Sequence, residues 1–276
     1  MTSVERTKKI GSGAFGSTVY KAVVNGWLCC LKEFPLDNAN AIDTDSFKKE
    51  IQTYTSVPCD NEHLCRFLGW RETSTHIQIF LRLYDTSLDK VLQEMRQRND
   101  YFSEAQLTLL AVQLLGALQV LHNRRIMHRD LKGGNVLVNY GDESHLCLVL
   151  SDFGESELGH KSRECVGTTR WMAPEVLSAT KTVGYSEKVD IWSFGMLLYE
   201  MMTLTVPYAD EPNHLHIPDL ILTGKIPTIN DAVRKRYPRV LLLWEELVCF
   251  DPGQRLSAAD ALILFGRLGD LLMTGK

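Results

Sequence analysis

The sequence predicts a bilobal α+β fold, in which a small lobe with an antiparallel sheet and one key helix precedes a large, mainly helical lobe. Residues 9–36 alternate apolar and polar side chains in the manner of strands, and Asn25-Gly26 is a two-residue hairpin signal. From residue 103 onward, leucines recur at helical spacing. The change of pattern divides the chain into a small lobe over about 1–81, a connector over about 82–87 and a large lobe over about 88–276.

The key helix of the small lobe is expected to begin near Asp43 or Thr44. Four residues recur at i, i+3, i+4 and i+7 and so share one face: Phe47, Glu50, Ile51 and Tyr54. Strands over 67–70 and 76–83 complete the sheet. Because an unpaired carboxylate on an apolar helix face is costly to desolvate, Glu50 needs a cationic partner.

The first long helix of the large lobe has a defined start. Ser103 and Gln106 have the spacing of a capping box, in which each side chain bonds the backbone of the other residue. Five leucines at helical spacing follow: Leu107, Leu110, Leu114, Leu118 and Leu121. We therefore expect a strongly apolar helix from residue 104.

Composition excludes several classes of function. The 276 residues carry a net charge of −4, so no basic surface for nucleic acid is indicated. The seven cysteines are an odd number without a CxxC pair, which argues against a disulfide framework and a zinc site and favours a reducing, cytoplasmic setting. We find no run of about 18 uncharged apolar residues and expect no membrane span.

A glycine-rich loop lies in the first strand region. Gly11, Gly13 and Gly16 match G-x-G-x-x-G, and Val19 follows in the string GSGAFGSTV. Glycines let backbone amides approach phosphate oxygens, but the same pattern occurs in dinucleotide-binding loops and in ordinary turns. A dinucleotide-binding loop opens a helix, whereas strand-like alternation follows here, which favours a hairpin folded over a nucleotide.

Two strings in the large lobe carry groups that handle metal ions and protons. HRDLKGGN holds Asp130 and, five residues later, Asn135, and SDFG holds Asp152. Carboxylate and amide oxygens are ligands that Mg²⁺ prefers, and a further carboxylate can receive an attacking hydroxyl group. Each residue alone could be a turn former, but the ordered set predicts phosphoryl transfer.

These strings, with CCLK upstream and APE downstream, occur in the order of a known signature. From about residue 10 to 268 the chain resembles the catalytic domain of eukaryotic protein kinases. The resemblance implies the protein-kinase fold, ATP and Mg²⁺ as cofactors, and a protein substrate.

The resemblance also assigns roles to the residues of these strings. Lys32 would neutralise the α- and β-phosphates of ATP and pair with Glu50. Asp130 would orient the substrate hydroxyl and Lys132 would stabilise the γ-phosphate. Asn135 and Asp152 would hold Mg²⁺.

The nucleotide pocket implied by the resemblance is mainly apolar. Val19, Cys30 and Leu137 would enclose the adenine, with Cys30 where the family usually has alanine. Leu81 would guard the space behind the base, and Leu83 belongs to the connector. The connector is one residue short of the commoner pattern, which leaves Phe80 as an alternative to Leu81.

The stretch 152–175 resembles an activation segment. Arg129 stands where the family often binds a phosphate on this segment. Thr168 is expected to contact Asp130 and Lys132, which leaves Ser162 and Thr169 as better sites for phosphorylation by an upstream kinase or by autophosphorylation in trans. Solvated loop hydroxyls remain the alternative.

Further residues are expected to support the site. Glu175 and Arg255 match a buried ion pair of the family, and Asp190 would bind the backbone of the catalytic loop. Four side chains resemble the stacked spine that couples the lobes: Tyr54, Phe67, His128 and Phe153.

The substrate class follows from smaller features. Lys132 is typical of serine/threonine kinases, and GTTRWMAPE resembles the tyrosine-kinase-like group, with leucine-rich-repeat and Roco-type kinases as neighbours. The alternatives are a nucleotide-binding pseudokinase or scaffold, a dual-specificity or tyrosine kinase, and a small-molecule or lipid kinase. The chain is expected to be part of a larger multidomain protein.

Overall fold

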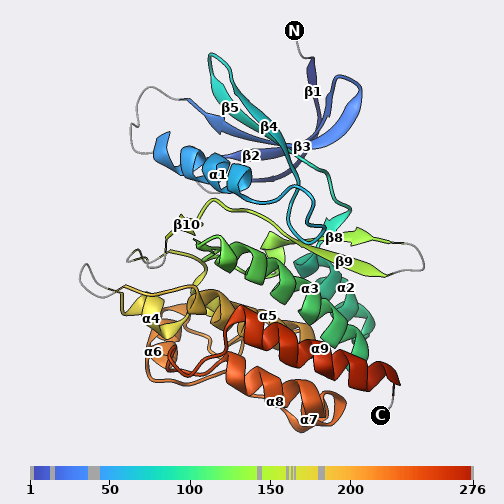
Figure 1. Ribbon diagram of the computed structural model, residues 1–276, viewed down its shortest axis with the longest axis vertical. Coiled ribbons are helices and arrows are strands. Elements are labelled where there is room, and N and C mark those ends of the chain that lie inside the picture. Colours follow the sequence, from blue (N-terminus) through green and yellow to red (C-terminus); the bar gives the residue numbers. More distant parts are fainter. Residues whose placement is uncertain are drawn as a thin grey trace.

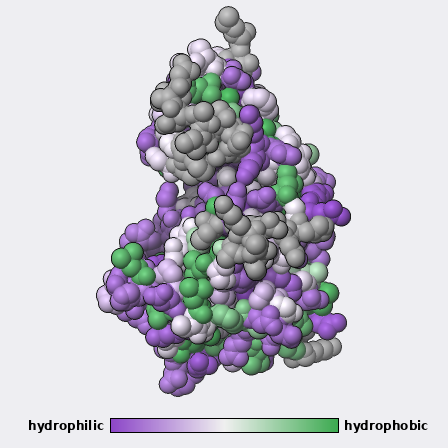
Figure 2. Space-filling view, turned by 90° about the vertical axis from the view of Figure 1, so that its left-hand side faces the viewer, coloured by the Kyte–Doolittle hydropathy of each residue, from purple (hydrophilic) through white to green (hydrophobic). Residues whose placement is uncertain are grey.

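The computed structural model describes residues 3–12, 16–36, 44–141, 145–159, 162, 164, 166–179 and 184–274. A five-stranded antiparallel sheet with the order β1-β2-β3-β5-β4 forms the upper part of Figure 1 together with helix α1, and helices fill the lower part. Figure 2 shows that the molecule narrows between the two parts and that hydrophobic residues on this face form small, separate patches. The predicted bilobal α+β fold is confirmed.

The sheet follows the predicted strand pattern. Its strands are β1 (Val4–Ser12), β2 (Thr18–Val24), β3 (Trp27–Pro35), β4 (Phe67–Glu72) and β5 (His76–Leu81). The turn between β2 and β3 consists of Asn25 (φ 50°) and Gly26 (φ 85°), so the predicted hairpin is present. Strand β5 ends at Leu81, two residues earlier than predicted, where its pairing with β3 and β4 stops.

Helix α1 (Thr44–Ser56) lies between the sheet and the lower lobe (Figure 1), and Tyr54 on its predicted face contacts Phe67 of the sheet and Phe153 of the lower lobe. Glu50 and Tyr54 are buried, Phe47 and Ile51 are half-buried, and Lys49 is exposed. The burial therefore follows the i, i+3, i+4, i+7 spacing, as expected for an amphipathic helix.

Helices form most of the lower lobe. They are α2 (Leu88–Arg98), α3 (Glu104–Asn123), α4 (Pro174–Leu177), α5 (Lys188–Thr203), α6 (Ile217–Leu222), α7 (Asp231–Arg236), α8 (Pro238–Leu247) and α9 (Ala258–Thr274). The capping box before α3 is present, because Gln106 N donates to Ser103 Oγ at 3.1 Å and Ser103 N donates to Gln106 Oε1 at 2.9 Å. Helix α5 is buried from Val189 to Met202 and forms the centre of the lobe.

Helix α3 differs from one expectation. By length and composition alone it could cross a membrane, although no such segment was predicted. Half of its apolar window is buried, and it packs against α9 and β9. A buried core helix satisfies the same criterion, so this is weak evidence for a span.

Short strands position the loops between the lobes. Strand β7 (Ile126–Met127) pairs with β10 (Glu157–Leu158), and β8 (Val136–Tyr140) pairs with β6 (Thr86–Ser87) and β9 (Leu146–Leu150). These pairings hold the loop 128–135 and the loop after β9 under the sheet (Figure 1). Both predicted catalytic strings therefore lie at the junction of the lobes.

Candidate active site

A cavity of about 550 Å³ lies between the sheet and the lower lobe. This volume is within the range of small-molecule sites. The predicted nucleotide contacts that line it are Gly11, Val19, Cys30, Lys32, Leu81, Leu83 and Leu137. Gly16 is not among the lining residues, and Gly13 lies outside the described residues.

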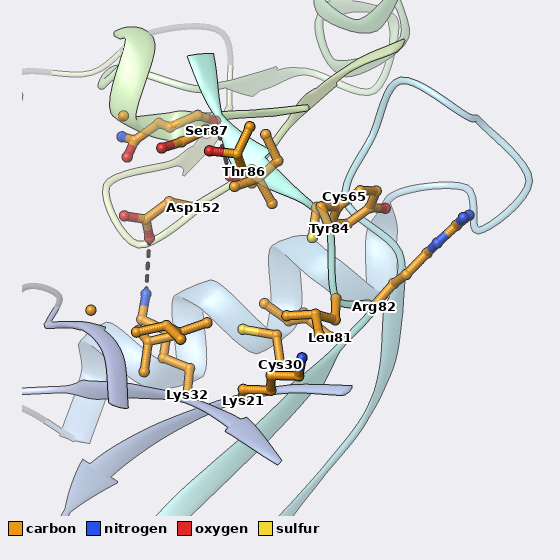
Figure 3. Close-up of a pocket in the computed structure, with 18 of the residues that line it drawn as sticks. Lys21, Cys30, Lys32, Cys65, Leu81, Arg82, Tyr84, Thr86, Ser87 and Asp152 are labelled. Atoms are coloured by element: carbon orange, nitrogen blue, oxygen red, sulfur yellow. Dashed lines mark hydrogen bonds and ion pairs between the residues drawn. The ribbon is translucent and has the colours of Figure 1, made fainter. Parts of the chain in front are cut away.

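Leu81, not Phe80, faces the cavity. Leu81 lies opposite Cys30 in the pairing of β5 with β3, and both side chains line the cavity (Figure 3). Phe80 packs with the cluster of Ala22, Cys29 and Leu31, and its ring lies 5.7 Å from the Arg71 guanidinium carbon. Because neighbouring residues of a strand face opposite sides, the strand register resolves the two alternatives.

Lys32 is a buried cation at the cavity, paired with carboxylates from both lobes. Its Nζ lies 2.8 Å from Glu50 Oε1 and 2.9 Å from Asp152 Oδ1, and Figure 3 shows it pointing toward Asp152. Burial would lower the pKa of Lys32, but the two carboxylates outweigh it and the net shift is upward. The predicted ion pair is thus present, and Lys32 is an ammonium ion.

Asp130 is the centre of a second cluster. Its Oδ2 accepts hydrogen bonds from Lys132 Nζ at 2.7 Å and from Asn135 Nδ2 at 2.8 Å. Its Oδ1 accepts the hydroxyl of Thr168 at 2.7 Å, and Thr168 Oγ1 accepts from Lys132 Nζ at 2.6 Å. The predicted contacts of Thr168 are therefore confirmed.

A buried carboxylate holds the backbone of this loop. Asp190 accepts hydrogen bonds from His128 N at 2.9 Å and from Arg129 N at 2.8 Å, as predicted. His122 Nε2 lies 2.8 Å from Asp190 Oδ2. Burial would raise the pKa of Asp190, but its hydrogen bonds and the histidines outweigh it, and the pKa is lowered. The hydrogen bond from Arg129 N to Asp190 thus stabilises the backbone of Arg129, whose φ of 69° is uncommon for a residue other than glycine.

Four rings connect the lobes. The ring of Tyr54 lies 5.6 Å from that of Phe67 and 4.9 Å from that of Phe153, measured between centroids. The ring of His128 lies 5.6 Å from that of Phe153. The predicted spine contacts are present, and they run from Phe67 of β4 through Tyr54 of α1 to Phe153 and His128 of the lower lobe. We refer to these four residues as the ring column.

The donor set at the cavity fits a hard cation. Asp152 lines the cavity with 40% of its side chain exposed, and the charge of Lys32 outweighs the effect of burial and lowers its pKa. Asn135 directs its amide nitrogen to Asp130, so its side-chain oxygen is the atom available to a metal ion. Among the described residues no group of three or more His, Cys, Asp or Glu could hold a metal ion by itself. Mg²⁺, however, commonly takes one or two protein oxygens and completes its shell with phosphate and water.

The ion pairs of Arg129 with two glutamates were not predicted. Arg129 lies 3.2 Å from the carboxylates of both Glu157 and Glu164, and it donates to Ser162 Oγ at 2.7 Å. The acidic residues in 152–175, together with the position of Arg129, were the signal available in the sequence. Ser162 itself is buried.

A buried ion pair anchors the end of the segment. Arg255 Nη1 lies 2.6 Å from Glu175 Oε1, and Arg255 Nη2 lies 3.1 Å from Glu175 Oε2. Arg255 also donates to the backbone oxygens of Lys188 and Cys249. The predicted pair is confirmed, in a bidentate geometry that is favourable for arginine and carboxylate.

Comparison with known proteins agrees with this geometry. Residues 4–263 match the family model described as "Protein kinase domain". The chain is 31% identical over 272 residues to Kinase and exchange factor for Rac B of Dictyostelium discoideum, covering 94% of the chain and 24% of that protein. It is 34% identical over 266 residues to Serine/threonine-protein kinase Nek11 of Mus musculus, and the match covers 92% of the chain and 40% of that protein. It is 29% identical over 270 residues to Mitogen-activated protein kinase kinase kinase 1 of Arabidopsis thaliana, and the match covers 95% of the chain and 42% of that protein. The chain thus spans less than half the length of these relatives.

Proposed function

The chain belongs to the protein kinase family, and we propose that it transfers the γ-phosphate of Mg-ATP to serine and threonine hydroxyls of protein substrates. The cluster around Lys32 and the cluster around Asp130 meet at one cavity, and this arrangement is the main support for the proposed activity. Lys32 of the small lobe contacts Asp152 of the large lobe, and Asn135, which lines the same cavity, is bonded to Asp130.

Each cluster has a task in this proposal. Val19, Cys30 and Leu137 give the adenine an apolar enclosure, and Lys32, held by Glu50, offers its ammonium to the phosphates. Asn135 and Asp152 would hold Mg²⁺, which supplies charge neutralisation at the phosphates. Asp130 orients the substrate hydroxyl and accepts its proton, while Lys132 stabilises charge on the transferred group.

The preference for serine and threonine rests on the loop around Asp130. Lys132 lies 2.7 Å from Asp130, where its ammonium would meet the γ-phosphate beside an acceptor hydroxyl. Relatives at 34% and 33% identity are named serine/threonine-protein kinases. Membership of the tyrosine-kinase-like group is a further part of the proposal and rests on the string GTTRWMAPE.

Regulation through the activation segment is also proposed, by an upstream kinase or by autophosphorylation in trans. Of the two candidate hydroxyls, that of half-buried Thr169 is more accessible than that of buried Ser162. We further propose that the chain works in the cytoplasm as one domain of a larger protein, as its relatives are much longer.

A phosphate-transfer assay tests the proposal. The purified chain is incubated with radiolabelled ATP, Mg²⁺ and a generic protein substrate, and the wild type is compared with Lys32→Met and Asp152→Ala. We expect both variants to lose at least ~99% of the activity, because each removes a charge that contacts the phosphates or the metal ion. Lys235→Met, at an exposed position of α7, is the matched control and should keep wild-type activity.

The outcomes separate the alternative functions. Equal incorporation by all variants would refute the proposed enzyme. Nucleotide binding without transfer would indicate a pseudokinase, and transfer to lipid alone would indicate a lipid kinase. Acid hydrolysis of the labelled substrate identifies phosphoserine, phosphothreonine or phosphotyrosine, so it also tests the acceptor class.

A further inference from the structure

Arg129 is a buried cation whose partners come from the activation segment. Its Nε donates to the backbone oxygen of Glu155, and its Nη1 donates to Ser162 Oγ at 2.7 Å. Both Nη1 and Nη2 lie 3.2 Å from a single oxygen of Glu164. Because a buried guanidinium requires a counterion, the carboxylate of Glu164, together with that of Glu157, balances the charge of Arg129.

The backbone groups of Ser162 and Glu164 are hydrogen-bonded to Tyr185. Ser162 N donates to Tyr185 O at 3.0 Å, and Tyr185 N donates to Ser162 O at 2.8 Å. The hydroxyl of Tyr185 donates to the backbone oxygen of Glu164 at 2.5 Å. Tyr185 is itself buried, and these three hydrogen bonds hold the backbone of Ser162 and the backbone oxygen of Glu164 near Arg129.

Glu164 also reaches the small lobe. Its Oε1 lies 3.7 Å from Lys49 Nζ on α1, in an ion pair whose two side chains are about half exposed. Lys49 precedes Glu50, the partner of Lys32, and Arg129 precedes Asp130. One carboxylate therefore contacts the neighbours of catalytic residues in both lobes.

A phosphate at Ser162 does not fit this arrangement. The Ser162 side chain is buried, and its Oγ already accepts a hydrogen bond from Arg129. A phosphoryl group there would add about two negative charges next to Glu157 and Glu164. Arg129 already has its anionic partners, so phosphate at this position would repel the residues that now bind the arginine.

We propose that Glu164 is a positioning residue that gives Arg129 a permanent counterion, so that the catalytic loop and α1 assemble without a phosphate on the activation segment. The inference rests on the proposed kinase function. Phosphorylation at Thr169 would then adjust an assembled site and would not be needed to create one.

The first test uses the wild-type chain treated with phosphatase, with mass spectrometry to establish that 152–175 is unmodified. We expect its kcat to stay within about twofold of the untreated protein, since Glu164 supplies the charge. A large loss of kcat that follows removal of a phosphate from 152–175 would overturn the inference.

The second test removes the charge of Glu164. Glu164→Gln should lower kcat about tenfold and change the KM for ATP less than about twofold, because Arg129 adjoins Asp130 and is not among the residues that line the cavity. Glu246→Gln removes an exposed carboxylate on α8 and should leave both constants unchanged. Wild-type kcat in the unphosphorylated Glu164→Gln variant would contradict the inference.

The third test detects a missing anion directly. Acetate should raise the activity of Glu164→Ala several-fold, whereas sodium chloride at equal ionic strength should not, because a carboxylate can occupy the place beside Arg129. A variant that merely loses folded structure would show no such rescue, and absence of rescue in a folded variant would count against the inference. An inactive wild type would refute the kinase function itself, so the two failures are distinguishable.

Discussion

The hydroxyl group of Thr168 donates a hydrogen bond to Asp130, with 2.7 Å between Thr168 Oγ1 and Asp130 Oδ1. The two residues are 38 positions apart, and the hydrogen bond joins the stretch 152–175 to the loop 128–135. The position of Asp130 therefore depends on the conformation of the stretch 152–175.

Thr168→Val should lower kcat about tenfold, because valine keeps the shape of threonine and removes the donor to Asp130. Thr168→Ser keeps the hydroxyl and should stay within about threefold of the wild type. The KM for ATP should change little in both variants, since Thr168 does not line the cavity. Steady-state kinetics at varied ATP check this, and a Thr168→Val variant with wild-type kcat would contradict it.

Gly167→Ala should displace the activation segment. Gly167 has a φ of 110°, and a Cβ at this position would lie 2.4 Å from the backbone oxygen of Arg129. We expect at least a hundredfold loss of kcat and a fall in Tm of at least about 2–4 °C, which corresponds to roughly 1 kcal/mol in a chain of this size. Gly266→Ala in α9, where an added Cβ meets nothing within 4 Å, should leave kcat unchanged and not lower Tm. Equal kcat and Tm in the two variants would show that a Cβ at position 167 is accommodated without displacing the segment.

Glu200 should make folding stability depend on pH. Burial raises its pKa from the usual 4.5 to about 7, with Arg96 opposing and Asp89 reinforcing the shift. The unfolded chain releases this proton at lower pH than the folded chain, so the free energy of unfolding should fall as pH rises from about 4.5 to 7 and level off above. The full effect of this group is about 3 kcal/mol.

Denaturant unfolding between pH 5 and 8 measures this effect. Glu200→Gln should lose this component of the pH dependence and gain stability relative to the wild type as pH rises. Glu246→Gln, at an exposed site of α8, controls for the loss of a carboxylate. A difference between wild type and Glu200→Gln that stays constant with pH would show that Glu200 is ionised throughout.

Cys30 should resist alkylation although it lines the cavity. Burial is the main reason that the pKa of its thiol is raised to about 11, so only ~0.1% is thiolate at pH 8. With iodoacetamide at pH 7.5, exposed Cys59 should be labelled well before Cys30, and labelling of Cys30 should accelerate at pH 9.5. Peptide mass spectrometry follows both sites. Equal rates at pH 7.5 would contradict the prediction.

Sequence predicts this fold well where local spacing decides the structure. The Asn25-Gly26 turn, the capping box of Ser103 and the buried face of α1 depend on residues within a few positions of each other. The contact between Lys32 and Glu50 is long-range, but the need of a buried carboxylate for a partner made it predictable.

Two parts of the site required the three-dimensional structure. The choice between Leu81 and Phe80 depends on strand register, because a shift by one residue exchanges the faces of a strand. The pairing of Arg129 with Glu164 depends on the path of an irregular segment, which no periodic pattern specifies.

The ring column and the ion pairs join the lobes by forces of different kinds. Dissolved salt screens exposed charges such as Lys49 and Glu164, whereas contact between the rings of Tyr54, Phe67 and Phe153 depends on exclusion of water. High salt concentration is therefore expected to weaken the ion pair and to leave the ring contacts in place. Because Tyr54 and Glu50 lie on the same helix, we expect the ring contacts to keep Glu50 near Lys32 at high ionic strength, whereas the contact of Lys49 with Glu164 should weaken.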